Sequence, residues 1–310
     1  MFGNRESAVM KQLENFYYGK NVLVTGGAGF IGSHLAEKLV ALGAHVTVLD
    51  NFSSGKISNL NTALTRVNLL YSDITAPYSA MKATHNKDIV FHLAACVSVP
   101  RSIANPTLCY KTNVEGTLNI LEGCKQNGVK TFIFSSSSAV YGNKNKFCKE
   151  DDQPSPESPY AHSKLEGEML GKKYAEESSL NTASLRYFNV FGERQNPNGD
   201  YAAVVAKFKQ NILLNKPLTI YGDGMQTRDF INVAQVVEAN LNIAMLNNIK
   251  GDIFNVGSGK SMNLFELIQH LEKELAREKS KVSFASPRDG DILHSQADCN
   301  KYKKALTQLS

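Results

Sequence analysis

Apolar, β-branched segments alternate with helix-like segments through the first half of the chain. The strand candidates are NVLVTGG at 21–27, AHVTVLD at 44–50, VNLLYSD at 67–73, DIVFHLAA at 88–95 and KTFIFSSSS at 130–138. Helical patterns lie between them at 33–43 and 105–128, and another follows from Pro159. Near-continuous apolar strands separated by helices predict a parallel sheet covered on both faces, with right-handed crossovers. The pattern therefore predicts an α/β fold with a doubly wound parallel sheet.

The pattern changes after about residue 186. The segments at 189–200 and 221–229 are rich in Asn, Pro and Gly, and the helices become shorter. We expect residues 1–185 to form the first domain, with 1–20 as an N-terminal extension that is a docked or frayed helix. Residues 186–310 are expected to form mainly a smaller substrate-binding lobe, from which 182–190 and 233–246 could return to the first lobe.

Length and composition fit a globular protein with two lobes. The chain has 310 residues, 42% of them hydrophobic, which is enough to bury a full core. No apolar run approaches the roughly 18 residues of a membrane span, and the first twenty residues mix charges throughout, unlike a signal peptide. The five cysteines are widely spaced, with no C-x-x-C pair and no histidine cluster beside them. This favours the cytoplasm and predicts no metal site.

The charge pattern narrows the class of partner. The formal net charge is +5, but the basic residues are spread among acidic ones instead of forming a block. This distribution argues against nucleic acid as a partner. A modest positive excess suits a small dianionic substrate.

Three glycines, Gly26, Gly29 and Gly32, lie between a predicted strand and a predicted helix with the spacing G-x-x-G-x-x-G. Gly26 permits a tight turn, Gly29 lets the backbone approach a pyrophosphate, and the N-terminus of the following helix supplies amide donors. Asp50 ends the next strand, where its carboxylate can bind both ribose hydroxyls and would repel a 2′-phosphate. This context predicts a Rossmann-type dinucleotide site that prefers NAD to NADP.

A tyrosine and a lysine four residues apart follow a helix start signal. Ser158 and Pro159 open the helix, so Tyr160 and Lys164 share one face. Taken alone, such a pair is common on helix surfaces. A phenol with a pKa of about 10 is ionised about once in a thousand molecules at pH 7, a deficit of roughly 4 kcal/mol. A lysine ammonium about 4 Å away supplies roughly the same energy at an effective dielectric near 20, so this lysine can stabilise a phenolate.

A series of motifs in order resembles the extended short-chain dehydrogenase/reductase family and, within it, the UDP-sugar 4-epimerases, most of all those acting on UDP-N-acetylglucosamine. The motifs are TGGAGFIGSH, LDN, SDI, FHLAA, TNVEGT, SSSSAVYG, SPYAHSK, LRYFNVFG, IYGDGMQTRDFINV and PRDGDILHSQAD. The resemblance covers nearly the whole chain. It implies an enzyme with bound NAD and a UDP-sugar substrate.

The resemblance implies catalytic roles for three residues. Tyr160 would be the acid/base, Lys164 its electrostatic partner and a ribose ligand, and Ser137 the hydroxyl that shares the substrate oxygen. Ser137 stands four residues before Tyr141 of the VYG motif, as the family's serine does, and Ser138 is the rival. In the expected reaction Tyr160 takes the proton of a sugar 4-hydroxyl while the C4 hydride passes to NAD. The 4-keto sugar then turns over and recovers the hydride on its other face.

The resemblance also implies two larger sets of ligand-binding residues. The cofactor set is Gly26, Gly29, Phe30, Ile31, Gly32, Asp50, Asn51, Asp73, Ile74, Leu93, Ala94, Ala95, Asn113, Tyr160, Lys164 and Tyr187. The substrate set is Ser98, Ser137, Asn189, Tyr221, Arg228, Arg288, Asp291 and Ser295. Alternatives stay open for three of them: Asp73 could cap a strand-end turn, Tyr221 could be a core tyrosine, and Ser98 could be a turn serine.

The family's dehydratases and decarboxylases carry acidic residues after the serine stretch, whereas SSAVYG has none, which favours epimerisation. Many strict glucose/galactose epimerases have a tyrosine at the position of Ser295, where serine frees space of about one acetamido group. The segment FGERQNPNGD also resembles epimerases of N-acetylated sugars. We therefore expect interconversion of UDP-N-acetylglucosamine and UDP-N-acetylgalactosamine, with UDP-glucose and UDP-galactose as a less efficient pair.

Other readings stay open. The chain could be another nucleotide-sugar epimerase, dehydratase or reductase of the same family, or a non-catalytic NAD-binding protein. In family dimers two helices pair across a two-fold axis, and the TNVEGT helix and the Tyr160 helix are amphipathic enough to do so. We therefore expect a homodimer.

Overall fold

The computed structural model describes residues 2–144, 147–197, 204–287 and 293–309. Within these residues the main sheet has seven parallel strands in the order β10-β6-β5-β4-β1-β2-β3. Their bounds are β1 (Asn21–Thr25), β2 (His45–Asp50), β3 (Val67–Tyr71), β4 (Ile89–His92), β5 (Thr131–Ser137), β6 (Asn181–Tyr187) and β10 (Lys250–Val256). The predicted doubly wound α/β fold is confirmed.

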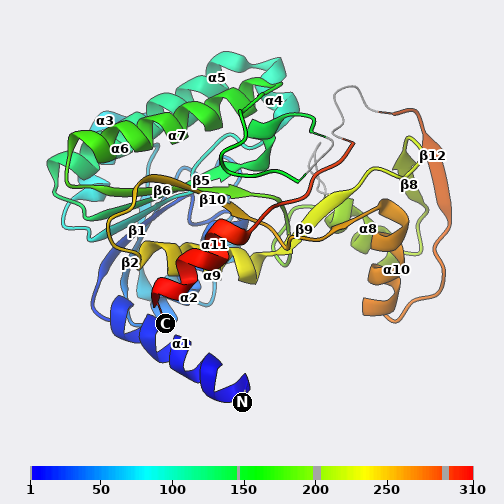
Figure 1. The fold of residues 1–310 in the computed structure, drawn as a ribbon, viewed down its shortest axis with the longest axis horizontal. Helices are drawn as coiled ribbons and strands as arrows, with labels where there is room; N and C mark the ends of the chain where they lie inside the picture. Colours follow the sequence, from blue (N-terminus) through cyan, green and yellow to red (C-terminus); the bar gives the residue numbers. More distant parts are fainter. Residues whose placement is uncertain (1, 145–146, 198–203, 288–292, 310) are drawn as a thin grey trace.

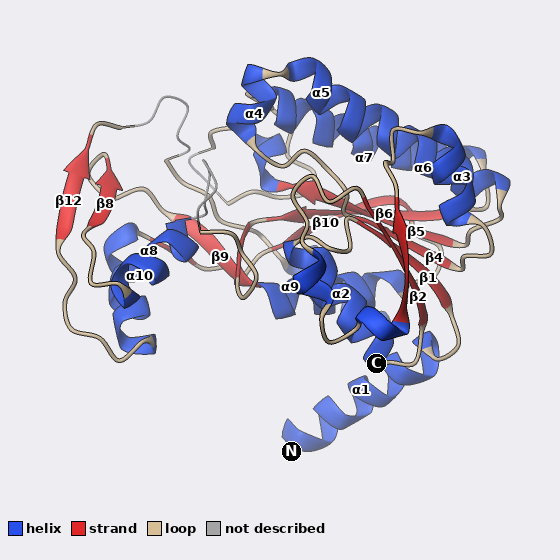
Figure 2. Cartoon of the chain, turned by 180° about the vertical axis from the view of Figure 1, so that it is seen from behind, coloured by secondary structure: helices blue, strands red, loops and turns tan. Residues whose placement is uncertain are grey.

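Helices cover both faces of this sheet (Figures 1 and 2). One face carries α3 (Pro77–Thr84), α4 (Val99–Ala104), α5 (Pro106–Tyr110), α6 (Gly116–Gln126) and α7 (Pro159–Glu177). The other carries α1 (Phe2–Tyr17), α2 (Phe30–Ala41), α9 (Val233–Ala244) and α11 (Asn300–Leu306). Apolar side chains alternate along the strands, so each face has its own core, with Val24 and Phe91 on the α2 side and Leu23 and Phe132 on the α6 side.

A smaller lobe lies beside the sheet, at the right of Figure 1. It contains a two-stranded sheet of β8 (Leu218–Tyr221) and β12 (Val282–Ala285) and a three-stranded sheet of β7 (Asn189–Phe191), β9 (Arg228–Asn232) and β11 (Ser261–Met262). The helices α8 (Val204–Leu213) and α10 (Leu264–Glu274) pack there around Phe208, Ile220 and Leu271. This lobe has a hydrophobic core separate from those of the main sheet.

The chain passes between the lobes several times. The expected boundary at 185/186 lies inside β6, whose Arg186 and Tyr187 still pair with β5. After β9, the chain returns to the main sheet through α9 and β10, and it returns again through α11. Short 3₁₀ turns lie at Ile57–Leu60, Leu64–Arg66, Ser138–Tyr141 and Thr307–Leu309, and a π-helical turn lies at Lys111–Glu115.

The N-terminal extension forms α1, which docks by its C-terminal end. Leu13 and Tyr17 are buried, and the Tyr17 hydroxyl donates to the Leu241 carbonyl oxygen of α9 at 2.8 Å. The rest of α1 projects away from the sheet (Figure 2). Among the described side chains of α1, the buried ones, Leu13 and Tyr17, lie one turn apart.

Candidate active site

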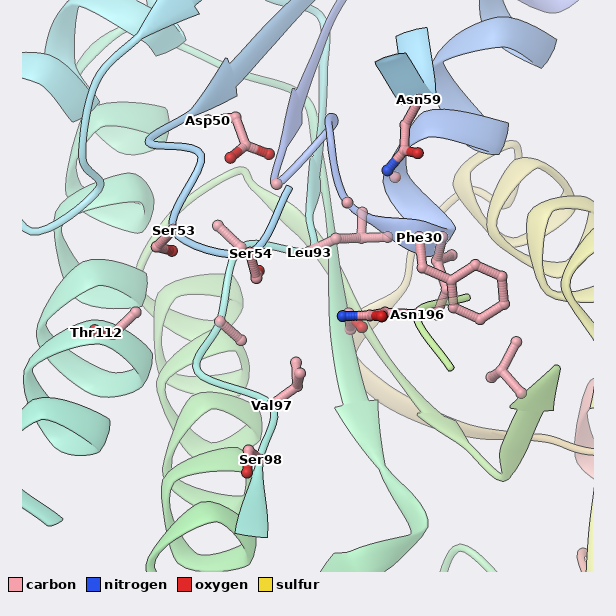
Figure 3. A pocket seen from close by; sticks show the side chains of 18 of the residues that line it. Phe30, Asp50, Ser53, Ser54, Asn59, Leu93, Val97, Ser98, Thr112 and Asn196 are labelled. Atoms are coloured by element: carbon pink, nitrogen blue, oxygen red, sulfur yellow. The ribbon is translucent and has the colours of Figure 1, made fainter. Parts of the chain in front are cut away.

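A cavity of about 880 Å³ lies at the carboxyl ends of the main-sheet strands, where doubly wound sheets bind ligands. Its walls come from the glycine loop after β1, the loops after β2 and β4, the end of β5, the start of α7 and the segment 194–197. In Figure 3, Asp50 lies toward one end of this cavity and Ser98 toward the other. The cavity is therefore elongated across the edge of the sheet.

The glycine loop is shaped to receive a ligand against its backbone. Gly26 has φ of +67°, and its N–H donates to the Leu49 carbonyl at 2.8 Å. A Cβ at Gly26 would lie 2.7 Å from the Ala94 nitrogen, and a side chain at Gly32 would overlap the Gly26 carbonyl oxygen. Glycine is required at both places, and α2 then begins at Phe30 with its amide donors at the cavity.

Asp50 is buried at the end of β2, where its carboxylate joins two loops. One oxygen accepts from the Ala28 N–H at 2.9 Å and the other from the Phe52 N–H at 2.8 Å. A carboxylate oxygen has two lone pairs, so each retains capacity for a ribose hydroxyl. The glycine cradle, the helix N-terminus and this carboxylate together fit NAD, whose ribose and pyrophosphate they would hold.

The start of α7 places the tyrosine and the lysine. Ser158 caps the helix, and its hydroxyl accepts from the Ala161 N–H at 3.2 Å. Lys164 is 3% exposed, its Nζ donates to the Ser135 carbonyl at 2.7 Å, and Nζ lies 5.9 Å from the centre of the Tyr160 ring. Burial lowers the pKa of Lys164 to about 8. Burial also raises the pKa of Tyr160, which a hydrogen bond with Ser137 partly offsets.

The structure distinguishes between the two candidate serines. Ser137 is the last residue of β5, lines the cavity and lies close enough to Tyr160 to lower the pKa of the phenol, against the larger raising by burial. Ser138 begins the 3₁₀ turn Ser138–Tyr141 and is not among the residues that line the cavity. The geometry therefore favours Ser137 as the partner of the tyrosine.

Most of the expected cofactor residues line the cavity. They are Gly26, Gly29, Phe30, Ile31, Gly32, Asp50, Asn51, Ile74, Leu93, Ala94, Ala95, Tyr160, Lys164 and Tyr187. Asp73 and Asn113 do not line it. The Asp73 carboxylate accepts from the Asn51 amide at 2.7 Å and from the Thr75 N–H at 2.8 Å, which are the contacts of a strand-end turn.

Asn113 acts from behind the cavity wall. It is buried in the π-helical turn, and its side-chain amide donates to the Ser163 hydroxyl at 2.9 Å and to the Cys96 carbonyl at 3.1 Å. Its side-chain oxygen accepts from the Cys96 N–H at 2.7 Å. Asn113 thus ties the loop after β4 to α7.

The expected substrate residues are divided between the lobes. Ser98 and Ser137 line the cavity, whereas the four described residues of the smaller lobe do not: Asn189, Tyr221, Arg228 and Ser295. Ser98 also caps α4 by accepting from the Arg101 N–H at 3.2 Å. Arg288 and Asp291 lie outside the described residues.

Two of the smaller-lobe residues lie side by side. The Ser295 N–H donates to the Thr227 carbonyl at 3.1 Å, and Arg228 Nη1 donates to the Leu293 carbonyl at 3.3 Å. Asn189 donates its side-chain amide to the Asp229 carbonyl at 3.0 Å. Ser295 is buried. These contacts bring the segments 227–229 and 293–295 together.

Sequence reasoning placed no site residue in the segment 194–197, which forms one wall of the cavity. Arg194 pairs with Glu37 of α2 at 2.6 Å and donates to the Ser33 hydroxyl at 3.1 Å. Gln195 donates to the Val190 carbonyl, and its Oε1 is a buried acceptor without a hydrogen-bond partner among the described residues. That oxygen is available to a ligand donor. The polar character of the segment FGERQNP is the sequence feature that could have indicated its place in the cavity wall.

In the described ranges, no helix is long and apolar enough to cross a membrane. The same residues contain no group of three or more His, Cys, Asp or Glu side chains placed to hold a metal ion.

Comparison with known proteins agrees with the geometry. The model of the NAD dependent epimerase/dehydratase family matches residues 22–257. UDP-glucose 4-epimerase of Mycolicibacterium smegmatis is 35% identical, over 92% of this chain and 91% of its own length. UDP-N-acetyl-alpha-D-glucosaminuronate decarboxylase of Bacillus cytotoxicus is 37% identical, over 85% of this chain and 82% of its own.

A solved structure shows the same likeness. UDP-N-acetylglucosamine 4-epimerase from Methanobrevibacter ruminantium M1, in complex with UDP-N-acetylmuramic acid, has 42% identity and a TM-score of 0.88, over 93% of this chain and 92% of its own. The family match and the fit of the cavity confirm the prediction of NAD as the cofactor. The chain belongs to the NAD dependent epimerase/dehydratase family, as one of its nucleotide-sugar epimerases.

Proposed function

We propose that the chain is a 4-epimerase that interconverts UDP-N-acetylglucosamine and UDP-N-acetylgalactosamine through a 4-keto sugar. One observation carries the reaction type. Among the described residues that line the cavity, Asp50 is the one carboxylate, and its oxygens already bind the Ala28 and Phe52 amides. Among the described residues, the reacting end has a tyrosine, a lysine and a serine but no acid that elimination of water would use.

The residues at that end perform the proton transfer. Tyr160 takes the proton of the sugar 4-hydroxyl, and Lys164 stabilises the phenolate that accepts it. Ser137 hydrogen-bonds the same oxygen and keeps it within reach of the tyrosine. The glycine loop and Asp50 would hold NAD, which would supply hydride-transfer chemistry at C4 when bound. Tyr160 then gives the proton back to the inverted C4 oxygen, so the reaction is redox-neutral.

The contacts of the serine stretch support epimerisation over elimination or decarboxylation. Ser138 and Ala139 follow the catalytic serine, so neither position provides a carboxylate. Glu168 lies behind the serines but is buried in an ion pair with Arg186 and does not line the cavity.

We assign the binding of the nucleotide and of the acetamido group to residues of the smaller lobe. The relatives named above include UDP-sugar 4-epimerases, one of them specific in name for UDP-N-acetylglucosamine. Arg228 is suited to a diphosphate because its guanidinium forms forked hydrogen bonds with phosphate oxygens. Ser295 is next to this arginine in space and is small enough to leave room for an acetamido group. We also assign Asn189 and Tyr221 to this subsite.

The experiment is NMR of the purified protein with a panel of UDP-sugars. We expect inversion at C4 with no change in substrate mass, and faster turnover of the N-acetylated pair. Loss of water would instead show a dehydratase, and loss of CO₂ from a UDP-uronic acid would show a decarboxylase. Recovery of bound NADP after denaturation would contradict the Asp50 assignment.

We further propose a homodimer that forms through the outer helices, in the cytoplasm. Leu108 of α5, Leu118 of α6 and Met169 of α7 are exposed apolar residues. These three helices lie together at the top of Figure 1. The five cysteines are free thiols, as in a reducing compartment. Met169→Lys should convert a dimer to monomer in sedimentation, and an unchanged mass would overturn this interface.

A further inference from the structure

Three residues of α7 at a spacing of four contact three consecutive serines at the end of β5. Tyr160 lies close enough to Ser137 for that hydroxyl to lower the pKa of the phenol, against the larger raising by burial, and Lys164 donates to the Ser135 carbonyl at 2.7 Å. Glu168 comes one turn later and accepts from the Ser136 hydroxyl at 2.5 Å. The first two contacts belong to the reaction. The third has no role in the proton transfer described above.

This third contact is part of a buried ion pair. Arg186 forms a fork with Glu168, with Nη2 to Oε2 at 2.7 Å and Nε to Oε1 at 2.9 Å. Glu168 is 4% exposed and Arg186 is 1% exposed. Ser136 and Arg186 are register partners on β5 and β6, so both side chains rise toward α7 from one face of the sheet. The guanidinium also stacks on Tyr141 at 4.6 Å.

Such a pair is an inefficient way to gain stability. Removing two charges from water costs about as much as their attraction returns, and apolar replacements of similar volume often fold equally well. The geometry of the pair has a clearer consequence, because Glu168 joins the helix that carries Tyr160 to Ser136, the strand residue next to Ser137. A displacement of about 1 Å between reacting groups can lower the rate about 100-fold.

We propose that Ser136, Glu168 and Arg186 form a positioning unit that holds α7 against the end of β5, so that Tyr160 and Ser137 meet the same substrate oxygen. This inference rests on the proposed epimerase function. The negative charge of Glu168 also raises the pKa of Lys164, against the larger lowering by burial, and so favours the ammonium that stabilises the phenolate.

Ser136→Ala tests the unit while leaving the ion pair in place. Ser184→Ala is the matched control, because Ser184 is equally buried, 3% exposed in each case, and lies on β6 two residues before Arg186. We expect Ser136→Ala to lower kcat about tenfold, with KM and bound NAD within twofold of wild type. The control should keep kcat within twofold. Equal kcat in the two variants would overturn the proposal, as would a loss confined to KM.

The double variant Glu168→Gln/Arg186→Met separates positioning from stability. It replaces the pair with neutral groups of similar size, so we expect a cooperative melt near that of wild type but a kcat at least tenfold lower. Adding Ser136→Ala should then cause no further loss, since the hydroxyl acts through Glu168. A folded double variant with wild-type kcat, or an additive loss, would overturn the proposal.

Two controls keep these results interpretable. If the double variant does not fold, the comparison of Ser136→Ala with Ser184→Ala decides the question. Wild-type protein is assayed with the same UDP-sugars, and its inactivity would refute the proposed function. Normal wild-type turnover with a fully active Ser136→Ala variant would refute the positioning unit alone.

Discussion

The cofactor side and the proposed substrate side of this molecule are built differently. On the cofactor side, Gly26 and Gly32 follow β1, Asp50 ends the adjacent β2, and all three line the cavity once the sheet forms. On the proposed substrate side, Arg228 and Ser295 come from distant segments that meet through backbone contacts in the smaller lobe. A site formed by the backbone at the end of a sheet takes its shape when the sheet folds. A site formed by side chains from separate segments also depends on the relative position of the two lobes.

The largest expected effect is at the reacting end of the first lobe. Tyr160→Phe removes the hydroxyl that exchanges the proton but keeps the ring, so we expect turnover to fall about 1,000-fold with NAD still bound. NMR of the sugar products measures the first effect, and the absorbance of the cofactor released by denaturation measures the second. Near-normal turnover would refute the role of Tyr160 as acid/base.

The next effect tests the substrate side. Ser295→Tyr should lower turnover of the N-acetylated pair about 10- to 100-fold by steric clash while the glucose/galactose pair is retained. The unacetylated pair is the internal control, because it reports general damage to the lobe. If both pairs respond equally, Ser295 does not select the substrate.

The Tyr160–Lys164 pair predicts activity that rises with pH. The titratable groups facing Lys164 are Tyr160, His92, Cys96, Cys109 and Glu168. Burial lowers the pKa of Lys164 to about 8 and raises that of Tyr160, so the pair loses its first proton near pH 8. The reactive form, a phenolate beside an ammonium, has lost one proton of the pair.

Below that pH the reactive form is a falling fraction of the protein. We therefore expect kcat/KM to rise about tenfold per pH unit up to about pH 8. A profile measured with one UDP-sugar between pH 6 and 9 is sufficient. A flat profile between pH 6 and 8 would show that this pair does not control the rate.

The smallest effect concerns the segment 194–197, where the two lobes share the cavity wall. Arg194→Ala removes its ion pair with Glu37, each side chain being 21% exposed, so we expect bound NAD to dissociate about 2- to 5-fold faster. Lys209→Ala, which breaks the Lys209–Glu274 pair of the smaller lobe, is the control. Equal dissociation rates in these two variants would show that Arg194 does not retain the cofactor.

The sequence predicts local geometry well. The glycine loop is required by close backbone approach, and the α7 pair follows from helical spacing after a proline, so both can be read from a few neighbouring residues. Spacing alone leaves Ser137 and Ser138 as alternatives; in the structure Ser137 ends β5 and lines the cavity, whereas Ser138 begins the next turn.

Contacts between side chains that are distant in the sequence cannot be predicted from such local patterns. Glu168 looks like an ordinary helix charge and Arg186 like a residue at the end of a strand, and only the register of β5 and β6 brings them together. The position of Asn113 away from the cavity also follows from long-range contacts, since the π-helical turn directs its side chain to Ser163 and Cys96. Arg194 meets Glu37 across the two lobes.

The position of β10 in the sequence has a consequence for the chain while it is being synthesised. β6 is an edge strand until Lys250–Val256 emerges from the ribosome, and β7, α8, β8, β9 and α9 are made in between. Until then its backbone donors and acceptors are open to pairing with another nascent chain. A fragment that ends near residue 185 would keep this open edge permanently. The NAD-binding half is therefore expected to aggregate when produced alone, although the glycine loop and Asp50 are both within it.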